Sequence, residues 1–166
     1  HNIKMLVVAC NTASAAAINA LKKYMFPIPV IGVIEPGVEA ALSIKSANSF
    51  LVLATEATVR LGAYSKAIKN LKSNARVREQ SCEILVSLAE EGWTSGQIAD
   101  LTVRQYLLEA EIDSFKADSI ILGCTHFPLL RETISGIANS AVVIDSAITT
   151  AKVVSKILSE NSWLTT

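Results

Sequence analysis

Two distant segments of the chain place a cysteine at the same point of a shared pattern. "LVVACNTASA" (6–15) and "IILGCTHFPLL" (120–130) each run from an apolar stretch through a small residue to a cysteine, a polar pair and a helix start. Open α/β sheets collect ligands at the carboxyl ends of their strands, where helix N-termini offer N–H groups to anions. Cys10 and Cys124 are therefore candidate reactive thiols, and His126 is placed to hold or accept a proton beside Cys124.

Inversion at an acidic carbon is the chemistry that needs two such thiols. A base must remove the proton from one face of the carbon while an acid delivers a proton to the other face. Cysteine suits both roles because its thiol and thiolate forms are both accessible near neutral pH. Each sulfur should lie about 3–3.5 Å from the carbon, so we expect the two sulfurs roughly 7 Å apart, too far for a disulfide.

Other interpretations of the cysteines have less support. Free cysteine is commonly a small core residue, and we favour that interpretation for Cys82. A zinc site built from Cys10, Cys82, Cys124 and His126 would lack both a CxxC pair and a His-x-x-x-His spacing, so no metal is expected. A thiol phosphatase needs Cys-x5-Arg, whereas six residues separate Cys124 from Arg131.

The elements that position these residues alternate between strands and helices. Strands are expected at 4–9, 30–34, 50–54, 75–80, 118–123 and 141–146, and helices at about 12–25, 38–44, 56–71, 84–92, 96–114, 129–138 and 147–159. Thr12 or Ser14 is the expected cap of the first helix, and Glu35-Pro36-Gly37 predicts a turn. This alternation predicts an α/β fold with parallel sheets flanked by helices on both faces.

The composition argues against several classes of partner. The 166 residues are 51% hydrophobic and 18% charged, which is enough apolar material to bury a core. Fifteen basic residues balance fifteen acidic residues without a block of like charge, so neither nucleic acid nor a membrane is an expected partner. No stretch has the character of a membrane helix or a signal peptide. Three widely spaced cysteines fit a reducing cytosol, so a cytoplasmic location is expected.

The two cysteine motifs together resemble those of the glutamate racemase family, within the aspartate/glutamate racemase superfamily. Further segments agree in order along nearly the whole chain: "PVIGVIEPG" (29–37), "ATEATV" (54–59), Cys82 through Glu90, and "VIDSA" (143–147). Ser14, which follows "CNTA", favours the glutamate branch, because aspartate-type relatives typically carry histidine there. The resemblance implies a bacterial isomerase that interconverts L- and D-glutamate and supplies D-glutamate for peptidoglycan and cell shape.

The resemblance also implies roles for individual residues. Cys10 and Cys124 match the two catalytic bases, one for each enantiomer, and His126 matches the histidine that assists its neighbouring cysteine. The substrate-binding residues implied in the same way are Asn11, Thr12, Thr125, Thr55, Thr58 and Glu90. The family needs neither pyridoxal phosphate nor metal, so no cofactor is expected, and the chain offers no glycine-rich phosphate loop.

The family pattern implies two pseudo-symmetric α/β domains with the active site in the cleft between them. Residues 1–36 and 143–166 are expected to form the remainder of the first domain, and 37–142 the second. Family members begin with a strand that leads into an Asp-Ser-Gly segment and later carry a Tyr-Gly stretch. This chain begins His1-Asn2-Ile3 beyond both, so we expect a truncated first domain. The sequence leaves a homodimer open.

Two local departures accompany the resemblance. Glu83 follows Cys82 where the family commonly has Cys-Pro, and Ser87 stands where a proline is expected.

Two alternatives for function also stay open. An aspartate-type or hydantoin-type racemase would use the same two thiols with different neighbours around the carboxylate. A catalytically inactive fragment would act only as a folded binding module. Exchange of the substrate α-hydrogen in heavy water separates these alternatives.

Overall fold

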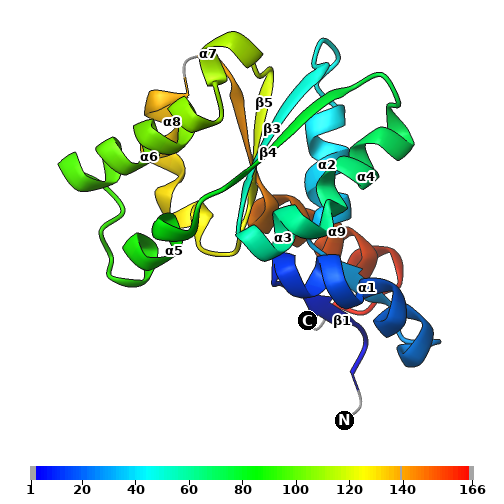
Figure 1. Cartoon of the computed structure of the whole chain (residues 1–166). Coiled ribbons are helices and arrows are strands. Elements are labelled where there is room, and N and C mark those ends of the chain that lie inside the picture. The colour runs from blue at the N-terminus through cyan, green and yellow to red at the C-terminus, as the bar shows by residue number, and fades with distance from the viewer. Residues whose placement is uncertain (1–2, 139, 165–166) are drawn as a thin grey trace.

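Two parallel sheets organise the computed structural model, which describes residues 3–138 and 140–164 (Figure 1). The smaller sheet pairs β1 (Leu6–Val8) with β2 (Val30–Gly32). The larger sheet has the order β4-β3-β5-β6, built from β4 (Arg76–Ser81), β3 (Ser49–Ala54), β5 (Ser119–Gly123) and β6 (Val142–Asp145). All the pairings are parallel, which confirms the predicted α/β class. His1, Asn2, Asn139, Thr165 and Thr166, which the predicted domains include, lie outside the described residues.

Helices cover both faces of the larger sheet, as Figure 1 shows. The helices are α1 (Asn11–Met25), α2 (Ile34–Leu42), α3 (Glu56–Leu61), α4 (Ala63–Leu71), α5 (Glu83–Glu90), α6 (Gln97–Glu109), α7 (Ile112–Phe115), the 3-10 helix η1 (Phe127–Leu130), α8 (Arg131–Ile137) and α9 (Ser146–Glu160). Helices α5, α6 and α8 lie on one face, and α2 and α4 lie on the other.

The buried core divides between these two faces according to the alternation of side chains along a strand. Leu51 and Leu53 of β3 belong to the larger cluster, which also contains residues of α5, α6, η1 and α8. Phe50 and Val52 belong to the smaller cluster with residues of α2 and α4. Both faces of β3 are therefore buried, as expected for a central parallel strand covered by helices.

Three local predictions were wrong, each for a backbone reason. The helix expected over 56–71 is two helices, because Gly62 adopts a left-handed conformation at φ 60 between α3 and α4. The helix expected over 96–114 ends at Glu109, and Glu111 at φ 49 separates it from α7. The predicted turn at residues 35–37 is the first turn of α2, where a proline is tolerated because its missing N–H would have no intrahelical partner.

The return of the chain toward the smaller sheet occurs later than the predicted domain boundary. Residues 142–145 form β6, which pairs with β5 in the larger sheet. The strand at the start of the segment 143–166 therefore belongs with the sheet of 37–142, and α9 is the part that packs against α2 and β2. The division into two domains stays a prediction. Within the described residues, we find no helix with the length and apolar character needed to cross a membrane.

Candidate active site

Cys10 lies at the N-terminus of α1, directly after β1. It is the N-cap of the 15-residue helix, and its Sγ accepts a hydrogen bond from the N–H of Ala13 at 3.4 Å. The predicted caps, Thr12 and Ser14, instead lie inside the helix. The Cys10 side chain is exposed, so its sulfur combines access to solvent with the positive end of a helix dipole.

Ser14, in the first turn of α1, connects the helix to both strands of the smaller sheet. Its Oγ donates to the carbonyl of Val8 at 2.9 Å and accepts from the N–H of Val33 at 3.3 Å. One buried hydroxyl thus ties the end of β1 to the residue after β2. The close approach needs Gly32, because a Cβ there would lie 3.2 Å from the Ser14 Oγ and 3.0 Å from Ile18 Cδ1.

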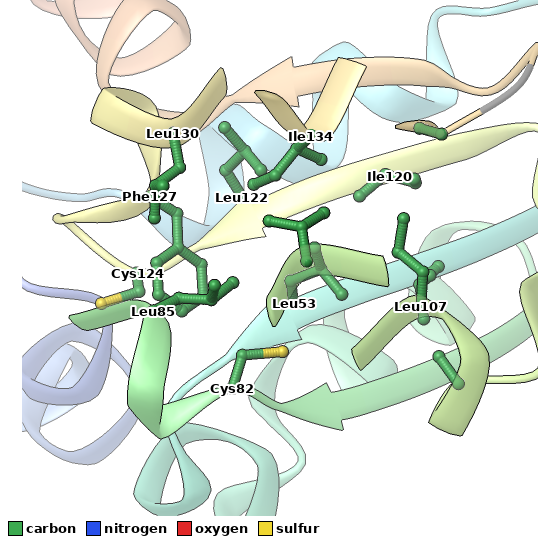
Figure 2. Close-up of a cluster of buried hydrophobic side chains, with 14 of the residues drawn as sticks. Leu53, Cys82, Leu85, Leu107, Ile120, Leu122, Cys124, Phe127, Leu130 and Ile134 are labelled. Carbon is green, nitrogen blue, oxygen red and sulfur yellow. The ribbon is translucent and has the colours of Figure 1, made fainter. Parts of the chain in front are cut away.

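Cys124 follows β5 and lies at the border of the larger hydrophobic cluster (Figure 2). Its exposed fraction is 6%, in contrast to that of Cys10. Burial raises the pKa of the Cys124 thiol above its ordinary value. The backbone N–H groups of His126 and Thr125 lower this pKa, whereas negative charge on Cys10 or Glu83 raises it. The balance favours the protonated thiol at neutral pH.

His126 connects Cys124 to a carboxylate. Its Nδ1 lies 3.7 Å from the Cys124 Sγ, and its Nε2 lies 3.2 Å from Oε1 of Glu90, at the end of α5. A neutral ring that carries its proton on Nε2 donates it to Glu90 and leaves Nδ1 to accept the Cys124 S–H proton. The structure therefore brings together His126, Glu90 and Cys124, whereas the sequence analysis paired only His126 with Cys124 and placed Glu90 among the substrate-binding residues.

Three threonine hydroxyls meet where α1 and α3 begin. The Oγ1 atom of Thr12 lies 3.0 Å from that of Thr55 and 2.9 Å from that of Thr58. The Thr55 and Thr58 hydroxyls are themselves 3.0 Å apart, and Thr55 caps α3. Residues 43 and 46 positions apart in sequence thus form one triangle of hydrogen-bonded hydroxyls, called the threonine triangle below.

Thr125 joins the two cysteine segments. Its Oγ1 donates to the carbonyl of Ala9 at 3.1 Å, across 116 positions of sequence. Ala9 precedes Cys10 and Thr125 follows Cys124, so this bond holds the two thiol-bearing strand ends beside each other. The influence of Cys10 on the pKa of Cys124 agrees with this proximity.

Asn11, the remaining predicted site residue, contacts Tyr64, which the sequence analysis did not predict. Its Oδ1 accepts a 2.6 Å hydrogen bond from the hydroxyl of Tyr64 on α4. Its Nδ2 is buried and has no hydrogen-bond partner among the described residues. In the sequence, Tyr64 is one aromatic position of an amphipathic helix, and no local motif distinguishes it.

The sequence matches those of known proteins over most of the chain. The family model described as Asp/Glu/Hydantoin racemase matches residues 1–154. The chain belongs to this family. A glutamate racemase from Geobacter metallireducens is 45% identical over 159 residues, which cover 95% of this chain and 58% of that protein.

Solved structures of family members have the same fold. The glutamate racemase of Francisella tularensis in complex with D-glutamate superposes with a TM-score of 0.89 at 35% identity, covering 99% of this chain and 60% of that one. A glutamate racemase isoform from Bacillus anthracis gives 0.88 at 36% identity, covering 96% and 59%. The racemase family member described here thus spans less than two thirds of the length of these relatives.

The third cysteine of this family member has a different setting. Cys82 is fully buried in the larger cluster, and its Sγ donates to the carbonyl of Gln80 at 3.5 Å. Burial raises the pKa of its thiol strongly, with smaller contributions from the charges of Glu109 and Glu83. This confirms the expected core position. Among the described residues, no three His, Cys, Asp or Glu side chains are grouped so that they could hold a metal ion.

Proposed function

We propose that this chain carries the two acid–base groups of a glutamate racemase and interconverts L- and D-glutamate without pyridoxal phosphate or a metal. The observation that carries the proposal is the pairing of two unlike thiols at one edge of the fold. Cys10 caps a helix and is exposed, Cys124 is buried beside His126, and Thr125 bonds to Ala9 between them. The glutamate racemases among its relatives support the choice of substrate.

In the proposed reaction, one thiol removes a proton and the other supplies one. The Cys10 thiolate takes the α-proton from one face of glutamate and becomes a thiol. The Cys124 thiol donates its proton to the opposite face of the carbanion and becomes a thiolate. Before the transfer, Nδ1 of His126 accepts the S–H proton of Cys124 as a hydrogen bond at 3.7 Å, while Glu90 accepts the Nε2 proton. After the transfer, Cys124 regains a proton from solvent and Cys10 releases its proton to solvent, which restores the starting state. The roles exchange when the opposite enantiomer is the substrate.

The donors around the thiols suit a carboxylate anion. The Nδ2 of Asn11, which has no hydrogen-bond partner among the described residues, supplies an amide N–H. A hydroxyl of the threonine triangle can donate to a ligand in exchange for one of the bonds within the triangle. Donors fixed in place before the substrate arrives would stabilise the negative charge that develops on deprotonation. We therefore assign Asn11, Thr12, Thr55, Thr58 and Thr125 to substrate binding.

The proposed product fits a role in cell-wall synthesis. D-glutamate is a component of bacterial peptidoglycan, so we propose that the reaction supplies this pathway. The two working thiols must stay reduced, which favours the cytoplasm as the compartment.

We further propose how the chain forms the substrate cleft. Residues 1–36 and α9 would form one wall, and residues 37–142 together with the remaining residues of β6 would form the other.

The test is exchange of the substrate α-hydrogen. The protein would be incubated with each glutamate enantiomer in heavy water and followed by NMR, both as this chain and as a chimera completed with the parts of the Geobacter relative that lie outside the match. We expect Cys10→Ala and Cys124→Ala each to lower exchange by about 10²–10⁴-fold, the usual effect of losing an acid–base group.

Cys82→Ala is the matched control, because it removes a thiol outside the proposed site and should leave exchange within a few fold of the parent. Aspartate and hydantoin substrates would be run in parallel. Exchange of aspartate instead of glutamate would overturn the choice of substrate. Folded, monodisperse protein that exchanges neither substrate, as chain and as chimera, would overturn the proposed function.

A further inference from the structure

Tyr64 contacts both cysteine-bearing segments from a buried position between them. The residue has no exposed surface, and its hydroxyl donates to Oδ1 of Asn11, the residue after Cys10, at 2.6 Å. Its ring lies against Gly123, the residue before Cys124, where a Cβ would be 3.1 Å from Tyr64 Cε2. One side chain of α4 therefore contacts the neighbours of both thiols, which are separated by more than a hundred positions of sequence.

We propose that Tyr64 is a positioning residue that orients the amide of Asn11 and sets the spacing of the two thiol segments. This inference rests on the proposed function, because the ligand of the Asn11 amide is taken to be the glutamate carboxylate.

The orientation of the amide follows from hydrogen-bond chemistry. A phenol that donates its single proton must face the carbonyl oxygen of the amide, so Oδ1 of Asn11 is engaged by Tyr64. The two protons on Nδ2 then point away from Tyr64, and this buried nitrogen has no partner among the described residues. An unpaired buried donor is costly, and a carboxylate oxygen is the type of acceptor that would satisfy it.

The environment of Tyr64 keeps its hydroxyl a donor. Burial raises the pKa of the phenol far above its ordinary value, and the charges of Glu79 and Cys124 raise it further. Tyr64 therefore stays protonated at neutral pH. Glu79 also fixes the backbone beside it, since its Oε1 accepts from the N–H of Ser65 at 2.9 Å.

The spacing of the two thiol segments depends on Gly123. A Cβ at position 123 would lie 2.9 Å from the carbonyl oxygen of Leu53 in the neighbouring strand, as well as against Val52 and Tyr64. Backbone on one side and a buried ring on the other cannot both yield, so any side chain here would displace β5 or Tyr64. The ring of Tyr64 thus acts as a fixed spacer against the strand that ends at Cys124.

A double-mutant cycle on substrate binding tests the proposal. We expect Tyr64→Phe to raise the Kd for D-glutamate about tenfold, since it removes the bond that orients Asn11. In an Asn11→Ala background the same substitution should change the Kd by less than about twofold. Tyr106→Phe is the control, because it also removes a hydroxyl with a hydrogen bond, here accepted from the backbone N–H of Ile84 at 3.1 Å, outside the proposed site.

Two outcomes of the cycle would overturn the proposal. Either Tyr64→Phe leaves the Kd unchanged, or it weakens binding equally with and without Asn11, which would indicate only a general loss of structure. Tyr64→Phe is also expected to lower kcat less than it raises KM, because the thiols themselves are retained.

A second measurement needs no activity and separates this proposal from the proposed function. In ¹⁵N NMR spectra of the chain, the Asn11 side-chain amide is identified by its loss in Asn11→Ala. We expect one sharp pair of signals in the parent and a shifted or broadened pair in Tyr64→Phe, with no change in Tyr106→Phe. If the parent neither binds nor exchanges glutamate, the proposed function fails while this pair still reports on Tyr64. An unaltered pair in Tyr64→Phe would overturn the role of Tyr64.

Discussion

The two proposed catalytic thiols have the same local sequence pattern and opposite surroundings. Cys10 ends a strand of the two-stranded sheet, is exposed and accepts an N–H at a helix N-terminus. Cys124 ends a central strand of the four-stranded sheet, is 6% exposed and has a raised pKa, first because it is buried. The proposed two-base reaction needs unlike roles from its two thiols, and the surroundings of Cys10 and Cys124 differ in exposure and in hydrogen-bond partners.

The regions around Cys10 and Cys124 should differ most in how much a packed side chain contributes to stability. Phe127 is fully buried in the cluster that contains Cys124, whereas Val7, beside Cys10 in the smaller sheet, is 38% exposed. Phe127→Ala should lower the free energy of unfolding by about 3–5 kcal/mol through the cavity it leaves. Val7→Ala should lower it by less than about 1 kcal/mol. Urea denaturation followed by circular dichroism measures both, and equal losses would contradict the contrast between the two ends.

Thiol reactivity is the next test of the comparison. Native protein treated with iodoacetamide at neutral pH should be alkylated at Cys10 at least about tenfold faster than at Cys124, and at Cys82 slowest of all. The physical reasons are the exposure of Cys10 and the burial of the other two thiols. Peptide mass spectrometry after timed quenching gives the three rates. Comparable rates for Cys10 and Cys124 in folded protein would remove the basis for assigning them unlike resting states.

The charge of Glu83 is expected to have a smaller effect, on the pKa and alkylation rate of Cys124. Its Oε1 accepts from the N–H of Glu56 at the start of α3, and its negative charge contributes to the raised pKa of Cys124. Glu83→Gln keeps an acceptor oxygen but removes the charge, so the pKa of Cys124 should fall toward its ordinary value. Alkylation of Cys124 as a function of pH should then begin at lower pH, with a few-fold higher rate at any pH below the wild-type pKa.

The sign of the accompanying stability change is fixed by linkage. The folded pKa of Cys124 lies above the unfolded value, so its protonated thiol stabilises the fold below the unfolded pKa, and this contribution is lost as pH rises through the folded pKa. Because Glu83→Gln lowers the folded pKa of Cys124, it should narrow the pH range over which the protonated thiol stabilises the fold. Glu39→Gln, an exposed carboxylate on α2, is the control and should leave the profile of Cys124 unchanged. A profile that moves to higher pH in Glu83→Gln would contradict the electrostatic account.

The sequence predicted the parallel α/β class and the positions of Cys10 and Cys124 after strands, because these follow from local patterns. The contact of His126 with Glu90 was not predicted. In a parallel sheet the carboxyl ends of neighbouring strands lie at one edge, so residues placed after strands meet there. Thr12 and Thr55 were assigned to one site only through the family resemblance, and their hydroxyls lie 3.0 Å apart.

The features that escaped prediction depend on the backbone or on distant contacts. The left-handed Gly62 splits a helix whose apolar periodicity continues across it, and periodicity is insensitive to such a break. Cysteine is an uncommon N-cap, so the cap of α1 was assigned to Thr12 or Ser14 instead of Cys10. Tyr64 acts across 53 positions of sequence, a separation at which no local motif can report a contact.

The threonine triangle has a consequence for the ligands that the proposed site would bind. Its three hydroxyls, at 2.9–3.0 Å from one another, already use their protons on each other. In the proposed site, a hydroxyl can donate to a ligand only by giving up one of these bonds. A carboxylate accepts stronger hydrogen bonds than a neutral group, so the triangle would favour anionic over neutral ligands irrespective of their shape.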